Sequence, residues 1–278
     1  MSMRIVIGLD GSPHAESALN MALRRAKRYG STLIGVGVVD RPSIEQIEVG
    51  AYPGSLQLSQ DAASKMLNDA KRRAEELIAA FRDVCTHHSV ACEDIIHSGS
   101  AAEGLLEEGK TADLIVTGLR TFFSFPATGQ SDDTLRQLFQ HPVCPVLAVP
   151  SNLELPRHVI IAYDGSPGAA RALHAYVAAT PELPEDIRVS LLCVSRDFER
   201  NKFHLEKADI YLHAHGITSD ILVCRGTPTE IIISTAKELM PSLVILGAPY
   251  YRGIAERLFG SVTEAVIKDG SIPVFVYH

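Results

Sequence analysis

The stretch "YDGSPGAARAL" at Tyr163–Leu173 decides the fold, because the chain carries nearly the same letters once before. Near the N-terminus, "LDGSPHAESAL" at Leu9–Leu19 contains the same Asp-Gly-Ser-Pro. In each copy a short apolar run precedes the aspartate, and a helical pattern follows the proline. Ser-Pro is typical of a helix start, because serine caps the helix and proline suits its first position. The chain therefore contains one strand, turn and helix unit twice.

The repetition extends along the whole 278-residue chain. Five pairs of matching residues at the ends of apolar runs occur in the same order in both halves: Asp10 with Asp164, Val38 with Val194, Gly99 with Gly226, Gly118 with Gly247, and Pro145 with Pro273. The spacing changes mainly between the second and third pairs, so the first half has an extra segment there, and we expect a loop at 41–60. The stretch 150–157 marks the boundary. We therefore expect two domains, 1–150 and 157–278.

Each half alternates short apolar runs with helical patterns. The apolar runs are β-branched, as strands covered on both faces of a parallel sheet are, and in the first half they lie at 4–9, 32–39, 113–118 and 145–149. Helices are expected at 13–29 and 61–81, with a shorter counterpart of the second around 203–215. The stretches 98–108 and 225–239 each indicate a glycine-marked strand end followed by a helix. Right-handed connections then predict the α/β class, with two repeated doubly wound, five-stranded parallel-sheet domains that are Rossmann-like.

The composition argues against several classes of protein. The net charge is −7 and no run of Lys or Arg exceeds three residues, which argues against nucleic-acid binding. The sequence shows neither 18 consecutive apolar residues nor a signal peptide, so we expect a cytoplasmic protein that contacts no membrane. The cysteines contain no C-x-x-C pair and are expected to be small, buried, reduced side chains: Cys85, Cys92, Cys144, Cys193 and Cys224.

Several of these matching residues fall beyond the carboxyl ends of the strands, where such sheets bind ligands. Asp10 and Asp164 end the first strand of each half, so they mark either a ligand crevice or only a turn and a helix cap. The second half adds "ILGAPYYRGIAERLFGSVTEAV" at 245–266, in which Gly260-Ser261 opens a helix. Free N–H groups, a hydroxyl and the positive helix end suit a bound phosphate. The alternative is an ordinary capped helix.

Taken in order, these residues resemble a known family. Asp-Gly-Ser after the first strand, "LLCV", "RGTPTEII" and then "LVILG…FGSVTEAV…IPVFV" are similar to the universal stress protein family. The resemblance covers both halves, so the chain is identified as a tandem member, and it implies that the two Rossmann-like domains are adenine nucleotide α-hydrolase-like. It implies a stress-response regulatory protein that binds an adenine nucleotide, with ATP favoured, mainly in the second domain. The alternative is a nucleotide-free protein-interaction module of the same fold.

The resemblance also implies particular site residues. Nucleotide-binding members are similar in carrying Gly-x2-Gly-x9-Gly-[Ser/Thr], and here Tyr250 stands where the second glycine is expected. A phenol there would crowd the triphosphate path or stack on another group. By resemblance, Asp164 and the backbone of Val194 hold the ribose and adenine. The implied phosphate contacts are Gly247, Gly260, Ser261 and the N–H of Val262, and the only metal implied is Mg²⁺ bound to the nucleotide.

The first half departs from this pattern. Thr121 takes the place of the second glycine, and Asp132-Asp133 take the place of Gly-Ser. A carboxylate about 4 Å from a phosphate costs roughly 4 kcal/mol at an effective dielectric constant of about 20, before screening. We therefore expect the first half not to hold ATP in the usual way. The segment "FFSFP" at 122–126 is either a partner surface or, as we favour, folds back over the vacated crevice.

Other residues suggest chemistry only weakly. The cysteines and histidines of 85–97 and 213–224 match no standard zinc spacing, so we expect structural roles and no metal site. Neither a Ser/His/Asp order nor a Cys–His pair stands out, nor the Ser-Gly-Gly or His-x-Gly-His motifs of related enzymes, so we expect no enzyme beyond slow ATP hydrolysis. In the resembling family the final edge strand pairs with its equivalent across a dimer. The resemblance therefore implies that "VLAV" pairs with "VFVY" inside the chain, as an intramolecular pseudo-dimer, or that the chain forms a homodimer. We also expect a protein partner, which the sequence does not identify.

Overall fold

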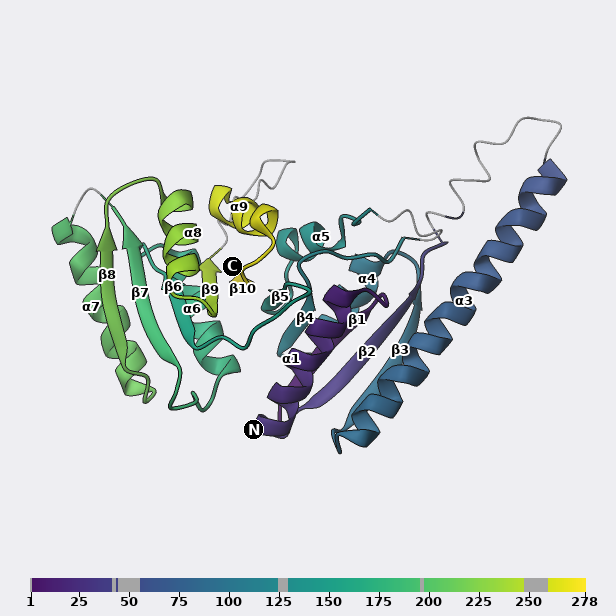
Figure 1. Ribbon diagram of the computed structural model, residues 1–278, viewed down its shortest axis with the longest axis horizontal. Coiled ribbons are helices and arrows are strands. Elements are labelled where there is room, and N and C mark those ends of the chain that lie inside the picture. The colour runs from purple at the N-terminus through teal and green to yellow at the C-terminus, as the bar shows by residue number, and fades with distance from the viewer. Residues whose placement is uncertain (1, 42–43, 45–55, 125–129, 196–197, 248–259) are drawn as a thin grey trace. The chain divides into compact units, whose positions relative to one another are not determined.

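The computed structural model describes residues 2–41, 44, 56–124, 130–195, 198–247 and 260–278. The chain forms two compact units, Met1–Cys144 and Pro145–His278. Each sequence repeat contributes five strands, β1 to β5 and β6 to β10, alternating with helices (Figure 1). The predicted α/β class with repeated, mainly parallel sheets is confirmed.

The first unit contains a parallel sheet of four strands in the order β3-β2-β1-β4. Its strands are β1 (Arg4–Leu9), β2 (Thr32–Val39), β3 (Cys92–Ser98) and β4 (Leu114–Gly118). Its helices are α1 (Pro13–Tyr29), α3 (Leu56–His87), α4 (Ala101–Gly109) and α5 (Thr134–Gln140). Figure 1 shows the long α3 running beside β2 and β3, against which it packs. The central strands are almost wholly buried, as apolar strands covered on both faces should be.

The second unit contains six strands in the order β5-β10-β9-β6-β7-β8. They are β5 (Val146–Val149), β6 (His158–Ala162), β7 (Arg188–Val194), β8 (Ser219–Cys224), β9 (Ser242–Gly247) and β10 (Val274–Tyr277). The helices are α6 (Pro167–Ala179), α7 (Phe198–Ala214), α8 (Pro228–Glu238) and α9 (Ser261–Asp269). β5 pairs antiparallel with β10, with Val146 opposite Val276, and the remaining pairs are parallel. The predicted pairing of "VLAV" with "VFVY" is therefore present.

The repeated Ser-Pro starts both helices as predicted. The Ser12 side chain accepts a hydrogen bond from the Ala15 N–H at 3.1 Å, and the Ser166 side chain accepts one from Ala169 at 3.2 Å. Each serine thereby satisfies one of the unpaired N–H groups of the first helical turn. Gly30 ends α1 in the left-handed conformation, with φ 64°.

Two predictions, on the long helix and on the cysteines, need correction. The long helix α3 spans 56–87, so it begins five residues earlier and ends six residues later than the predicted 61–81. The expected loop at 41–60 therefore ends in helix, and most of its other residues lie outside the described part. Cys92 and Cys224 are half-buried instead of buried, because β3 and β8 are the last strands of their sheets and have a neighbour on one side. Cys85, Cys144 and Cys193 are buried as predicted.

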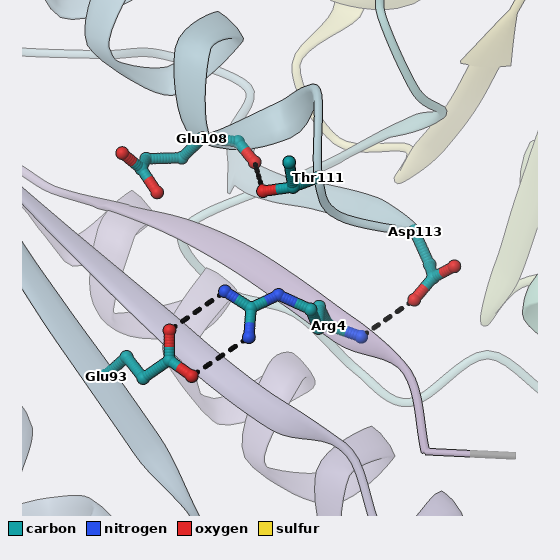
Figure 2. Close-up of polar contacts among 5 residues, drawn as sticks. All are labelled: Arg4, Glu93, Glu108, Thr111 and Asp113. Atoms are coloured by element: carbon teal, nitrogen blue, oxygen red, sulfur yellow. Dashed lines mark hydrogen bonds and ion pairs between the residues drawn. The ribbon is translucent and has the colours of Figure 1, made fainter.

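A polar cluster joins strand starts at the opposite end of the first sheet from the repeated turn. Figure 2 shows the Arg4 guanidinium donating two hydrogen bonds to the Glu93 carboxylate, at 2.9 and 2.8 Å. The Arg4 N–H donates to Asp113 at 2.8 Å, and Thr111 donates to the Glu108 carbonyl at 3.4 Å. These contacts connect the beginnings of β1, β3 and β4. The charged residues of this cluster therefore have a structural role.

Candidate functional site

The Asp-Gly-Ser-Pro turn of the second unit lies beyond β6. One Asp164 oxygen, Oδ1, accepts a hydrogen bond from the Ser166 N–H at 2.9 Å, which fixes the turn. The Asp164 side chain is exposed, and its other oxygen has no protein partner among the described residues. Gly165 follows with φ 79°, a conformation that favours glycine. The turn therefore holds a carboxylate oxygen outward at the end of a buried strand.

All six predicted site residues line one pocket of about 220 Å³ in this unit. The pocket lies where β6, β7 and β9 end and where α6, α8 and α9 begin. The predicted residues that it brings together are Asp164, Val194, Gly247, Gly260, Ser261 and Val262. Tyr250, the predicted departure from the glycine pattern, lies outside the described residues.

Gly247 has a packing role at the floor of this pocket. A side-chain carbon placed on Gly247 would lie 2.3 Å from the Gly168 carbonyl carbon and 2.4 Å from the Ala169 nitrogen. Such distances are far inside normal contact, so the first turn of α6 requires a glycine at the end of β9. The equivalent carbon on Gly118 would lie 2.5 Å from Cβ of His14. This glycine is therefore explained in both units without any ligand.

Gly260 and Ser261 open α9 as predicted. Gly260 is the N-cap residue, with φ −58°, and no side chain caps the helix. Within the described part of the chain, no cap side chain accepts from the first N–H groups of α9, and these groups border the pocket through Ser261, Val262 and Thr263. Backbone N–H groups at a positive helix end attract an anion. This part of the pocket is suited to a phosphate or another small anion.

Sequence reasoning missed much of the pocket wall. Tyr163 and Thr263 add polar groups, and burial together with the neighbouring Asp164 raises the pKa of the Tyr163 phenol. The apolar wall consists of Ala162, Ala169, Leu192, Pro228, Ile232 and Leu246. Tyr163 could have been found from the sequence, because it directly precedes the predicted Asp164. Ile232 lies on the buried face of α8, and its neighbours in the sequence do not indicate a ligand site.

The equivalent crevice of the first unit is almost filled. Its remaining cavity is about 20 Å³, and Phe122 and Phe123 line it. The Phe122 N–H donates to Oδ2 of Asp10 at 2.7 Å, while Oδ1 accepts from the Ser12 N–H at 2.8 Å. Asp10 is buried, with 3% of its surface exposed, unlike Asp164. The favoured prediction that this segment folds back over the crevice holds for Phe122 and Phe123, and 125–129 lie outside the described residues.

The filling is accommodated by a second difference between the repeats. Phe123 is buried, and its ring lies against Gly8 of β1, where an added side-chain carbon would be 2.7 Å from Cζ of Phe123. Ala162 occupies the equivalent strand position in the second unit and lines the open pocket. The smaller residue in β1 therefore makes room for the ring that fills the crevice.

A carboxylate of the chain occupies the polar part of the first crevice. Asp132 accepts hydrogen bonds from the Thr121 hydroxyl at 2.5 Å, the Phe123 N–H at 2.5 Å and the Thr134 N–H at 3.0 Å. When the two units are aligned on the first residues of α5 and α9, Asp133 corresponds to Gly260, because each is the N-cap residue of its helix. The sequence alignment placed Asp132 opposite Gly260, one residue earlier. Both acidic residues lie where the second unit has neither a charge nor a side-chain cap.

The described residues show neither a metal cluster nor a membrane span. They contain no group of three or more His, Cys, Asp or Glu that could hold a metal ion. None of the helices in the described ranges is long and apolar enough to cross a membrane.

The fold and the strand-end pocket define a doubly wound α/β protein of the Rossmann-like class, built from two repeats. A family model described as "Universal stress protein family" matches residues 1–150 and 196–278, more than half of the chain. The chain therefore belongs to the universal stress protein family.

Several relatives match over both repeats. Universal stress protein Slr1230 of Synechocystis sp. is 21% identical over 286 residues, which cover 99% of each chain. Universal stress protein Rv2623 of Mycobacterium tuberculosis is 23% identical over 296 residues, covering 99% of this chain and 96% of the relative. The solved structure of a universal stress protein from Archaeoglobus fulgidus matches with a TM-score of 0.67 at 17% identity, covering 98% of this chain and 97% of that one. This structural likeness shows the fold.

Proposed function

We propose that this protein is a stress-response regulatory protein that binds an adenine nucleotide, preferably ATP, in its second domain. One observation carries the proposal: the six residues expected from the sequence line a single pocket of about 220 Å³, although they come from four separate parts of the chain. The same crevice in the first domain has about 20 Å³. The contrast between the open crevice of one unit and the filled crevice of the other supports a ligand site in the second domain.

The proposed orientation follows from the chemistry of the pocket ends. At one end, the uncapped start of α9 offers N–H groups and the Ser261 hydroxyl to phosphates. At the other, the Asp164 oxygen that has no partner among the described residues is a suitable acceptor for a ribose hydroxyl. Between Leu192, Ile232 and the end of β7 lies the apolar surface proposed for the adenine. Mg²⁺ would accompany the phosphates without a cluster of protein ligands.

The proposal is tested by measuring bound nucleotide and by adding a charge at the phosphate end. Purified protein is denatured, and the released nucleotide is identified by mass spectrometry; titration calorimetry then compares ATP, ADP and AMP. Gly260→Asp should weaken ATP binding by about a thousandfold, because roughly 4 kcal/mol of repulsion corresponds to three factors of ten. The φ of −58° at Gly260 accommodates aspartate without backbone strain.

A matched variant separates local repulsion from a change in net charge. Thr218→Asp adds the same charge at an exposed residue between α7 and β8, and it should leave ATP binding unchanged. Absence of released nucleotide together with absence of any heat or thermal shift at millimolar ATP would refute the proposal. Binding of two nucleotides per chain would refute its restriction to the second domain.

A nucleotide-free role is favoured for the first domain alone. Phe123 fills the crevice of this unit and Asp132 occupies its polar end, so the crevice is closed where the second unit has an open pocket. We propose that this domain serves for interaction with a protein partner. Truncating Phe123 should leave the nucleotide stoichiometry at one per chain, because the acidic residues remain.

A further inference from the structure

A second pocket of the second unit lies at the end of the sheet opposite the Asp164 turn. Its volume is about 230 Å³, close to the 220 Å³ of the pocket beside Asp164. It lies at the starts of β9 and β10, whereas the other pocket lies where β6, β7 and β9 end. Among the described residues, none lines both pockets. At about 30 Å³ per water molecule, the space corresponds to about seven waters, or to one small organic molecule.

The antiparallel pairing of β5 with β10 places one wall of this pocket. Because β5 runs opposite to β10, the chain leaves β5 beside the start of β10. The segment 150–154 then forms the wall as the chain passes toward the start of β9. It is held there because the N–H groups of Arg157 and His158 both donate to the Pro241 carbonyl, at 2.8 and 3.2 Å. The wall is therefore fixed at both of its ends.

The carboxyl ends of two helices form another part of the wall. Gly270 ends α9 with φ 74°, and Met240 follows shortly after the last residue of α8. The Lys237 ammonium forms an ion pair with Asp269, which connects the two helix ends. The last carbonyl groups of a helix carry a partial negative charge. Both helices therefore favour a cation at this end of the sheet.

The side chains that line the pocket add a negative charge to these helix ends. Glu154 is exposed, and it forms no ion pair within the described ranges. The described lining contains neither Lys, Arg nor His, and Lys237 is already paired with Asp269. The apolar part of the lining consists of Pro150, Leu153, Met240, Pro241 and Pro273. A carboxylate beside apolar walls suits an organic cation.

We propose that this pocket binds a small primary alkylamine as its ammonium ion. The Glu154 carboxylate and the Asn152 amide oxygen accept hydrogen bonds from the ammonium group, and the alkyl chain contacts Leu153 and Met240. A quaternary ammonium ion is disfavoured, because it has no N–H and is usually bound by aromatic rings, and no described lining residue is aromatic. The single carboxylate favours a monoamine over a diamine. The site goes beyond the proposed nucleotide binding and does not depend on it, so either proposal can fail without the other.

Nuclear magnetic resonance of the methionine methyl groups tests the site directly. The full chain contains five methionines, which are labelled with ¹³C in their methyl groups, and Met240→Leu assigns the Met240 signal. The protein without nucleotide is titrated with n-pentylamine at neutral pH. The expected result is a saturable shift of the Met240 signal with a dissociation constant of about 1 mM, as suits so small a molecule. Pentanol, pentanoate and pentyltrimethylammonium should each bind at least about tenfold more weakly.

Two variants identify the recognised charge. Glu154→Gln should weaken pentylamine binding about tenfold, because the charged hydrogen bond is lost while the alkyl contacts remain. Glu185→Gln removes the same charge from an exposed residue between α6 and β7 that does not line the pocket, and it should leave binding unchanged. The proposal is overturned if Met240 shows no saturable shift well above millimolar amine, if any of the three other probes binds as tightly as pentylamine, or if the two variants behave alike.

Discussion

The two crevices of this protein start from the same turn and end in opposite states. Asp10 is buried and bonded through both oxygens, whereas Asp164 is exposed and has one oxygen without a protein partner in the described structure. The turn and the serine helix cap are alike in both units, and the strands differ at Gly8, where the second unit has Ala162. The groups that fill the crevice or leave it open come much later in the chain: Phe123 and Asp132 in one unit, and an uncapped helix start in the other. The comparison teaches that the turn belongs to the scaffold, while the later segments decide whether a crevice remains.

The largest expected effect comes from removing the ring that fills the first crevice. Phe123→Ala should lower the free energy of unfolding by about 3 kcal/mol, because a buried ring is lost and a cavity remains against Gly8. Urea denaturation measures the change. Phe203→Ala is the matched control, since Phe203 is 55% exposed on α7 and its truncation should have little effect. Equal effects at both positions would contradict a filled crevice.

The glycines at the ends of β4 and β9 should be equally necessary despite the different crevices. Gly118→Ala and Gly247→Ala should each destabilise their unit by about 2 to 3 kcal/mol, because the added methyl group collides with the first turn of α1 or α6. Thermal unfolding without nucleotide measures both. A large loss for Gly247→Ala alone would mean that this glycine serves something absent from the first unit.

The negative charge of Asp132 in the first crevice should stabilise the folded protein. Asp132→Asn should cost about 2 kcal/mol, because three donors face the carboxylate and an amide turns one N–H toward them. Denaturation of the variant beside Asp133→Asn tests this assignment, since the exposed Asp133 makes no side-chain cap hydrogen bond. A greater loss at Asp133 would transfer the role to the N-cap residue.

The two helix caps should show how closely the shared scaffold is matched. Ser12→Ala and Ser166→Ala should each cost about 1 kcal/mol, because each removes one acceptor from the start of a helix. Calorimetric unfolding of the two variants gives the values. A difference between them much larger than their mean would show that the repeats differ already at the turn.

The smallest effect is expected at the polar cluster far from either crevice. The hydrogen bonds from Arg4 lower the pKa of the Glu93 carboxyl below its ordinary value of 4.5. A lowered pKa stabilises the folded state above the ordinary pKa, and this contribution disappears as the pH falls through the folded value. Glu93→Gln should therefore lower the melting temperature slightly at neutral pH and not at all well below pH 4.5. An equal difference at both pH values would exclude the ion pair as its cause.

The sequence could predict those features that depend on local pattern. The strands around Arg4–Leu9, the serine caps and the start of α9 at Gly260 follow from apolar runs, cap residues and glycine placement. The six residues of the second pocket were found because their spacing resembles a family motif. The ends of α3 were missed because its helical pattern continues past 61–81 in both directions without a strong stop.

The filling of the first crevice could only be stated as one of two alternatives. Whether Phe122 and Phe123 face solvent or the sheet depends on Gly8, which is more than 100 positions away in the chain. The part played by Asp132 likewise depends on donors from Thr121 and Phe123, which the loop brings back to the helix start. Contacts of this kind are set by tertiary packing, which local propensity does not encode.

The Asp132 carboxylate differs from a bound phosphate in one further way: it is covalently attached to its own binding site. A tethered group pays no translational entropy to reach its donors, and its local concentration is set by the connecting chain and not by the cell. The occupancy of the first crevice is therefore insensitive to the concentration of any solute. Under the proposed function, the crevice beside Asp164 would instead fill and empty as the nucleotide concentration rises and falls, and the chain would then contain a single dose-dependent element although it is built from two copies.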